Sequence, residues 1–377
     1  MNFTLSDEQQ MLRKMARDFL TDRCHKTPGR ESETDDDGHS PLLWQEMAEL
    51  GWVGLVFPEE YGGGGMSFLD LAVLLEEMGR VCLSGPFFST VVLGGLSILD
   101  AGSEEQKLEY LPQIASGEVI CTLALTEAGA QYDAASIRVK ATAGKDGYII
   151  NGTKLFVPDA YIADYFLCVA RTNERAKAEE GITIFLVDAK SPGISCTVLD
   201  TIASDKLCEV IFDQVKVPET NILGQLDLGW SEVQRIIERA AVAKCCEMVG
   251  GIQQVLEMTI AYAKERRQFD RPIGSFQVIQ HYCANMATDV DGLWLATYQA
   301  AWMLSEGFPC TKEISITKVW TGEAGERVII MAHQIHGTIG VTMDHDLHLY
   351  TKRTKAANVT FSDTDFYREI VAQQMGL

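Results

Sequence analysis

The longest helical pattern in the chain is GWSEVQRIIERAAVAKCCEMVGGIQQVLEMTIAYAKERRQF, residues 229–269. Apolar residues recur three and four positions apart through most of it, which predicts one long amphipathic helix. Within it, KCCEMVGG (244–251) places one carboxylate, Glu247, beside two glycines. Each glycine costs a helix roughly 1 kcal/mol relative to alanine, so both features need a reason.

The segments on either side of this helix differ in their periodicity. Residues 1–118 and 223–377 are mostly helical by period, whereas residues 119–222 hold short β-branched and aromatic segments separated by turn signals. No helical pattern alternates with these strands, which argues against a Rossmann unit. We therefore expect an α+β protein with an N-terminal helical domain (1–118), a middle antiparallel β-barrel or sandwich (119–222) and a C-terminal four-helix bundle (223–377).

Composition narrows the class of partner. A formal net charge of -21 over 377 residues argues against nucleic acid and anionic membrane surfaces, because both require a basic face. The longest apolar run, which starts at Val91, is too short to span a bilayer. The amino terminus resembles a helix start, with Ser6 and Gln9 at capping-box spacing, and not a secretion signal. Ten cysteines without a CxxC pair fit a reduced, cytoplasmic protein.

Two motifs indicate a function. They are YAKERRQFDRPIGSFQ (262–277) and HQIHGTIGVTMDHDLHLYTKR (333–353). With PEEYGGGGM (58–66) and the helical, β, helical order, they closely resemble the acyl-CoA dehydrogenases, flavoenzymes that oxidise acyl-CoA thioesters at the α and β carbons. The resemblance runs from Phe3 almost to the carboxyl end. It implies FAD as cofactor, a flavin-sharing oligomer that is usually a tetramer, a role in β-oxidation and an electron-transfer flavoprotein as acceptor.

The resemblance also assigns residues to FAD. Arg266 matches the arginine that binds the pyrophosphate, for which a planar guanidinium is well suited. The glycines of the second motif match those that let a neighbouring subunit approach the ADP half, although Thr338 stands where many members have glycine. Taken singly, these residues also fit helix-terminal charges and a helix C-cap. The FAD-binding residues implied are Arg266, Gln268, Phe269, Gln277, Gln334, Gly337, Thr338, Gly340, Thr126 and Phe156.

The middle domain departs from the family pattern. The TEPGAGSD signature appears as TEAGAQYD (126–133), which keeps Thr126 and Glu127 but replaces the serine with Tyr132. The WITN-like strand appears as FVPD, in which Phe156 can shield the flavin while Pro158 offers neither a hydroxyl nor an N–H.

The catalytic base is not where most relatives carry it. The reaction needs a group that removes the α-proton while the β-hydrogen leaves as hydride, and a carboxylate in a dry pocket serves well. The common glutamate, in a YEGT-like stretch, corresponds to Phe361, with Asp363 two residues on as a weak substitute. A minority of relatives carry it on the long helix, at a position corresponding to about Ala240.

Glu247 is the remaining candidate, seven residues and two turns beyond Ala240. CCEMVGG matches the AAEMVGG-like pattern of members that resemble steroid side-chain acyl-CoA dehydrogenases, in which this glutamate is catalytic. Two structural interpretations stay open: an ion pair with Lys244, worth about 0.2–0.5 kcal/mol at an exposed site, and a subunit interface.

We therefore predict an FAD-dependent acyl-CoA dehydrogenase that forms an enoyl-CoA from a branched, cyclic or bulky acyl-CoA. One alternative is an FAD-sharing subunit of a mixed tetramer whose base lies on a partner chain. Others are a flavin oxidase or monooxygenase on the same scaffold and a non-enzymatic CoA-binding scaffold. We expect no metal site, because His336 belongs to the second motif and the DHDLH run resembles an exposed loop.

Overall fold

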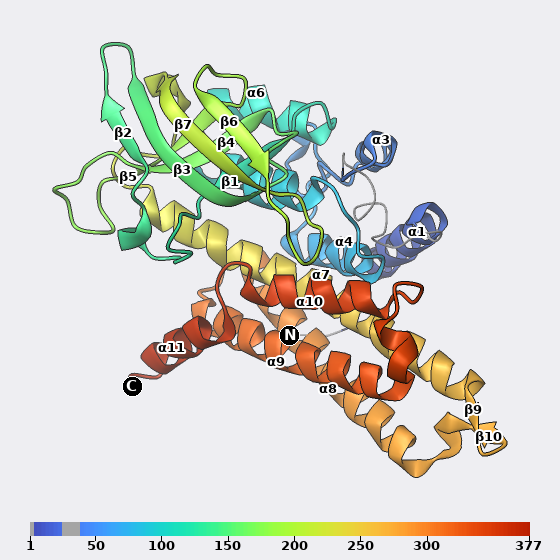
Figure 1. Cartoon of the computed structure of the whole chain (residues 1–377). Coiled ribbons are helices and arrows are strands. Elements are labelled where there is room, and N and C mark those ends of the chain that lie inside the picture. Colours follow the sequence, from blue (N-terminus) through green and yellow to red (C-terminus); the bar gives the residue numbers. More distant parts are fainter. Residues whose placement is uncertain (1–3, 25–37) are drawn as a thin grey trace. The chain divides into compact units, whose positions relative to one another are not determined.

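The computed structural model describes residues 4–24 and 38–377 and divides them into two compact units (Figure 1). The helical unit contains residues 4–24, 67–83 and 241–377; the sheet unit contains residues 38–66 and 84–240. The N-terminal third of the chain thus contributes to both units. The boundaries at 118 and 222 stay a prediction.

The helical unit is built from long helices around one apolar core. That core includes Val255, Met286, Leu293 and Val328. The long helix expected from periodicity is confirmed: it is α7, with 36 residues. The elements of the unit are α1 (Asp7–Cys24), α4 (Phe68–Arg80), α7 (Trp230–Glu265) from residue 241, β9 (Arg267–Gln268), β10 (Arg271–Pro272), α8 (Gln277–Ser305), α9 (Thr311–His336), α10 (Leu347–Val359) and α11 (Thr364–Gln374).

Local signals in this unit behave as expected. The Ser6 amide donates to Oε1 of Gln9 (3.1 Å) and the Gln9 amide donates to Oγ of Ser6 (3.2 Å), so the capping box before α1 is confirmed. Figure 1 shows the β9–β10 hairpin at the end of the unit where α7 gives way to α8. The first motif therefore forms the connection between two long helices.

The sheet unit surrounds an eight-stranded sheet in the order β6-β7-β3-β2-β4-β5-β8, with β1 beside β4. The pairings are antiparallel except those of β4 with β1 and with β2, so the mainly antiparallel sheet is confirmed. The strands are β1 (Cys121–Ala124), β2 (Lys140–Ala143), β3 (Tyr148–Pro158), β4 (Tyr165–Arg171), β5 (Ile182–Asp188), β6 (Ile194–Val198), β7 (Leu207–Val217) and β8 (Ile222–Leu223). The helices are α3 (Pro41–Glu49), a π-helix (Phe88–Gly95), α5 (Leu96–Ala101), α6 (Glu104–Ala115) and the start of α7.

Strand β3 carries two irregularities that shape the sheet. The first is a bulge at Asn151-Gly152, where the pairing with β7 shifts and Gly152 has φ +141°. The second lies between Lys154 and Val157 and puts Phe156 at φ +54°. Both bulges re-aim side chains along a strand that pairs with β7 over most of its length.

The apolar run that starts at Val91 lies in the π-helix and α5, where it is buried. Among residues 4–24 and 38–377, no helix combines the length and the apolarity needed to cross a membrane.

Candidate active site

Glu247 lies on the accessible stripe of an otherwise buried helix turn. Among residues 241–250 of α7, only Lys244 and Glu247 are half-buried, and the rest are buried. The half-buried positions continue at Gly251 and Gln254, three and four residues apart, so they form one face of the helix. The Glu247 side chain keeps 25% of its surface exposed on this stripe.

The ion pair with Lys244 that the sequence allowed is present. Nζ of Lys244 lies 2.7 Å from Oε2 of Glu247. Both side chains are about a quarter exposed or less, and pairs near the surface contribute roughly 0–1 kcal/mol. The pair orients the carboxylate along the stripe and adds little to stability.

The glycines beside Glu247 have a packing explanation, in the crossing of α4 and α7. A Cβ added at Gly250 would lie 1.8 Å from the carbonyl oxygen of Glu76, and one at Gly79 would lie 1.9 Å from that of Glu247. Since Cβ atoms do not approach oxygens so closely, the two backbones touch only because both positions are glycine. Gly251 differs, because a Cβ there would lie 3.4 Å from the Gly79 oxygen, an ordinary contact.

The sequence contains a signal for this crossing, a spacing that α4 and α7 share. EEMG (76–79) and EMVG (247–250) share the spacing Glu-x-x-Gly. In the structure each glycine faces the carbonyl oxygen of the other helix's glutamate. A small residue at matching positions of two predicted helices indicates where their backbones approach closely.

Helix α10 brings the second motif to the same region. The Tyr350 hydroxyl donates to the Arg80 carbonyl at the end of α4 (2.6 Å). Cys82 is buried nearby, and burial raises the pKa of its thiol to about 12, with smaller influences from the charges of Arg353, Asp346 and Glu247. Glu247 and the charged residues of the second motif therefore act on one buried atom.

The other positions considered for the base offer none. Phe361 is buried at φ +57°, and Ala240 is buried. Asp363 caps α11, because Oδ1 accepts from the Phe366 amide (3.0 Å). Its role as a substitute base therefore competes with a helix-capping bond.

A buried charge network anchors α1 to α4, and sequence reasoning missed it. Arg13 (3.1 Å) and the Tyr298 hydroxyl (2.6 Å) both donate to Oε2 of Glu76. Burial raises the pKa of Glu76 although Arg13 and Tyr298 favour the charged form. Arg17 donates to both carboxylate oxygens of Glu77 (2.7 and 2.9 Å).

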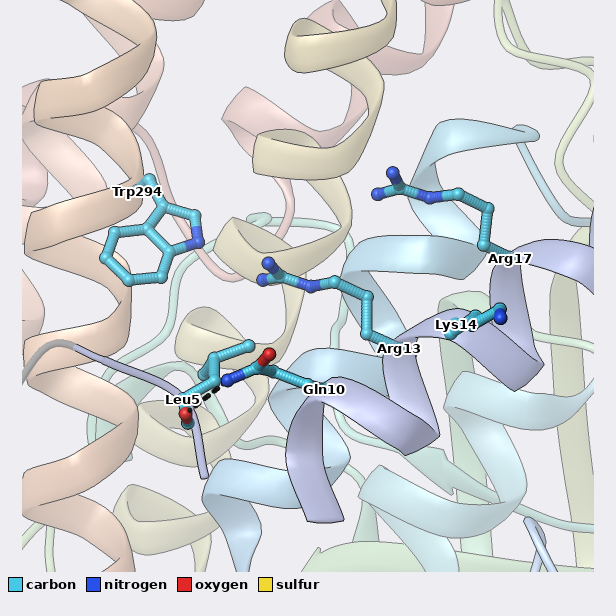
Figure 2. A pocket seen from close by; sticks show the side chains of 6 residues that line it. All are labelled: Leu5, Gln10, Arg13, Lys14, Arg17 and Trp294. Atoms are coloured by element: carbon cyan, nitrogen blue, oxygen red, sulfur yellow. Dashed lines mark hydrogen bonds between the residues drawn. The ribbon is translucent and has the colours of Figure 1, made fainter. Parts of the chain in front are cut away.

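An open pocket of about 480 Å³ lies beside this network (Figure 2). Figure 2 shows the Arg13 guanidinium and the Trp294 ring on its walls. The lining residues are Leu5, Gln10, Arg13, Lys14, Arg17 and Trp294. None of the residues predicted from sequence lines it, and both its arginines are bound to glutamates.

The first cofactor motif is presented outward. Phe269 and Asp270 form the hairpin turn with φ of +53° and +64°, and the Phe269 ring is 87% exposed. Its described ring contact is an edge-on approach to Phe276, with 6.1 Å between centroids. Arg266, Gln268 and Gln277 are also exposed. An exposed aromatic ring and an exposed guanidinium can each contact a large anionic, ring-bearing group.

The second cofactor motif lies at the same end of the helical unit. The Tyr262 ring, on the last turn of α7, stacks on His336 at the end of α9 (4.4 Å, 20° between planes). Burial, with His345 and His333 nearby, lowers the pKa of His336 to about 4. The two motifs are therefore brought together by direct packing.

The glycines of the second motif have different surroundings. Gly337 ends α9 with φ +62° and ψ −142°, and a Cβ there would meet no described atom within 4 Å. A Cβ at Gly340 would lie 3.0–3.1 Å from Leu347, His333 and His336. The backbone at Gly337 is thus open, and the side chains of Gln334 and Thr338 are exposed. Gly340, in contrast, is required for packing within the chain.

The remaining predicted cofactor residues belong to the sheet unit. Thr126 is buried, and Phe156 is 46% exposed at the second bulge of β3. Glu127 binds the Nζ of the fully buried Lys154 (2.7 Å) and accepts from the Val139 amide (3.1 Å). In the Thr-Glu pair of the altered signature, the glutamate is therefore hydrogen-bonded within the sheet unit.

Among residues 4–24 and 38–377, no three His, Cys, Asp or Glu side chains gather as a possible metal site. Nε2 of His333 is hydrogen-bonded to the Thr351 hydroxyl (2.7 Å), and Nδ1 of His348 to the His345 carbonyl (2.7 Å).

Comparisons with known proteins cover the chain almost end to end. The acyl-CoA dehydrogenase N-terminal, middle and C-terminal domain models match residues 6–118, 122–215 and 227–376. The probable acyl-CoA dehydrogenase YngJ of Bacillus subtilis is 32% identical over 381 residues, which covers 100% of both chains.

Solved structures agree with the sequence relatives. Butyryl-CoA dehydrogenase from Megasphaera elsdenii superposes with a TM-score of 0.94 at 26% identity over 100% of both chains. The ChsE4-ChsE5 complex from Mycobacterium tuberculosis gives a TM-score of 0.90 at 28% identity, over 100% of this chain and 99% of that one. The chain therefore belongs to the acyl-CoA dehydrogenase family, flavin-dependent oxidoreductases that act on CH–CH bonds.

Proposed function

We propose that the chain is an FAD-dependent acyl-CoA dehydrogenase in which Glu247 is the base. The observation that carries this proposal is the position of Glu247, a carboxylate on the accessible stripe of α7 next to Gly251. Neither Phe361 nor Ala240 can take a proton, and Asp363 is engaged as a helix cap.

In this proposal the carboxylate of Glu247 accepts the proton from the α carbon of the acyl thioester. Bound FAD supplies the acceptor for the hydride that leaves the β carbon, so an enoyl-CoA forms. The Lys244 ammonium holds the carboxylate in place, and the α4–α7 crossing fixes the helix that carries it. Because Glu247 lies away from the two common positions of the base, we propose a branched, cyclic or otherwise bulky acyl group as substrate.

The residues assigned to FAD fit the chemistry of that group. Arg266 is an exposed guanidinium that can bind a pyrophosphate through two parallel hydrogen bonds. Phe269 offers a free ring face, and Gly337 leaves its backbone open to a ligand. Within the helical unit, the further proposed FAD contacts are Gln268, Gln277, Gln334, Thr338 and Gly340. Within the sheet unit, the proposed FAD contacts are Thr126 and Phe156.

The test is the Glu247→Gln variant, measured for FAD content and for flavin reduction by a panel of acyl-CoA esters. We expect FAD to be retained and turnover to fall by about 100- to 10 000-fold, the usual contribution of a general base. Glu257→Gln is the matched control, because Glu257 lies on the same helix and is ion-paired with Arg80 (2.6 Å). Ordinary turnover in Glu247→Gln would assign the base to another residue.

A second candidate function is a flavin-sharing subunit of a mixed tetramer whose partner chain supplies the base. It is favoured by Phe361 at the usual base position and by the altered TEAGAQYD signature. The similar ChsE4-ChsE5 protein is a complex of two named chains. Flavin-to-chain ratio and native mass of the chain expressed alone distinguish the two: a full flavin complement in a homotetramer excludes the need for a partner.

The acceptor follows from the family resemblance. We propose an electron-transfer flavoprotein, and a flavin oxidase or monooxygenase reaction is the alternative. After reduction by substrate, slow reoxidation in air and fast reoxidation by an electron-transfer flavoprotein support the dehydrogenase. Fast reoxidation by oxygen alone supports the alternative.

A further inference from the structure

The sheet unit contains two cysteines close together on neighbouring strands. In the β6–β7 pairing, Cys196 lies opposite Val210 and Cys208 lies opposite Val198. Residues two apart on a strand share a face, so Cys196 and Cys208 are diagonal neighbours on one side of the sheet. Each of the two thiols shifts the pKa of the other, so the two side chains lie close to each other.

The two thiols differ in a way that suits thiol–disulfide exchange. Cys196 is exposed, and the hydrogen bond from Cys208 lowers the pKa of its thiol, which favours the nucleophilic thiolate. Cys208 is fully buried, and its hydrogen bond with Cys196, together with burial, raises the pKa of its thiol. Cys196 can therefore react with an oxidant in solvent, and Cys208 lies next to it but is shielded from solvent.

Cys196 lies on an edge strand of the sheet. β6 ends the strand order of the sheet, and among the described residues it pairs with β7 alone. An edge strand held by one neighbour can shift more easily than a central strand. A disulfide needs Cα atoms about 4.4–6.8 Å apart, whereas diagonal neighbours on adjacent strands lie about 7–8 Å apart, so closure of the bond requires β6 to shift toward β7.

We propose that Cys196 and Cys208 are a reactive thiol pair that low-molecular-weight disulfides oxidise to an intrachain disulfide joining β6 to β7. The Cys196 thiolate attacks one sulfur of the oxidant, its S–S bond breaks and one small thiolate leaves. The Cys208 sulfur then attacks Cys196, the mixed disulfide breaks, and the proton of Cys208 leaves with the second small thiol. The protein loses two electrons and the oxidant is reduced to two thiols.

The location links this chemistry to the predicted flavin contact. Cys208 pairs with Val157 on β3, the residue after Phe156 at the second bulge. Oxidation therefore joins the edge strand to the strand next to Phe156. This consequence rests on the proposed function, whereas formation of the disulfide does not.

The test treats the native full-length protein with oxidised glutathione and maps disulfides by non-reducing peptide mass spectrometry. We expect a Cys196–Cys208 cross-link, a loss of two of the ten thiols and full recovery with dithiothreitol. Cys24 and Cys283, which are half-buried, serve as internal references and should not join the cross-link. Amide exchange of residues 194–198 should slow on oxidation.

Two variants make the order of steps testable. Cys196→Ser should leave Cys208 unmodified, and Cys208→Ala should stop at one glutathione adduct on Cys196, with circular dichroism to confirm folding. Wild-type protein that gives only adducts on Cys196, or no reaction there, overturns the proposal. A cross-link without any change in flavin fluorescence keeps the thiol pair and counts against Phe156 as a flavin contact.

Discussion

Two regions of the helical unit carry predicted chemistry in opposite ways. Around Glu247, the chain holds its own residue in place: α4 and α7 touch backbone to backbone at Gly79 and Gly250, and Lys244 binds the carboxylate. At the β9–β10 hairpin, the chain presents side chains to the outside, with Phe269 87% exposed and Arg266 exposed.

The difference indicates what each region needs. A proton-transfer group requires a fixed position, which tight helix packing within one chain supplies. The hairpin, which we propose contacts FAD, must leave its hydrogen-bond donors accessible to that ligand. Changes at the crossing should therefore affect stability, and changes at the hairpin should affect binding.

The largest effect is expected at the crossing itself. Gly250→Ala places a Cβ against the Glu76 carbonyl and forces the helices apart, which should lower the free energy of unfolding by about 3 kcal/mol. Gly251→Ala is the matched control and should stay within about 1 kcal/mol, with alanine's helix propensity in its favour. Equal denaturation midpoints for the two variants would contradict the tight crossing.

The second effect concerns the hairpin. Arg266→Ala removes a charge-assisted bond to the proposed pyrophosphate, so FAD affinity should fall by about ten- to hundred-fold while stability changes by less than about 0.5 kcal/mol. FAD titration and thermal melts measure the two quantities. Arg267→Ala is the control for charge, because Arg267 donates to the Asp270 carbonyl inside the turn (3.0 Å). Unchanged FAD affinity in Arg266→Ala would remove it from the site.

The third effect depends on pH. His336 has its pKa lowered from 6.5 to about 4, so the unfolded chain binds more protons between these values. The contribution of His336 to the free energy of unfolding should have its full value above about pH 6.5. It should fall as the pH drops toward 4, by about 1–2 kcal/mol at pH 5. In His336→Gln this fall in stability at acid pH should disappear. In His281→Gln, at an exposed position, the fall should persist. Parallel stability–pH curves for wild type and His336→Gln would contradict it.

The smallest effect belongs to the ion pair at the predicted base. Lys244→Met should lower the free energy of unfolding by less than about 1 kcal/mol, because the pair is partly exposed. A double-mutant cycle with Glu247→Gln isolates the coupling. A coupling above about 2 kcal/mol would instead make Glu247 a structural residue.

The sequence by itself determined the features that depend on near neighbours along the chain. Periodicity predicted α7, and capping-box spacing predicted the start of α1. The family motifs were also readable, because each is a short run of residues. Their roles as base and cofactor ligands stay predictions.

Only the tertiary structure decided which distant residues meet. Gly250 is required because a carbonyl at residue 76 faces it, and Glu76 is held by Arg13 and Tyr298. Cys196 and Cys208 become neighbours through the register of β6 on β7. These contacts depend on how helices cross and strands pair, and the local propensity of a segment specifies neither.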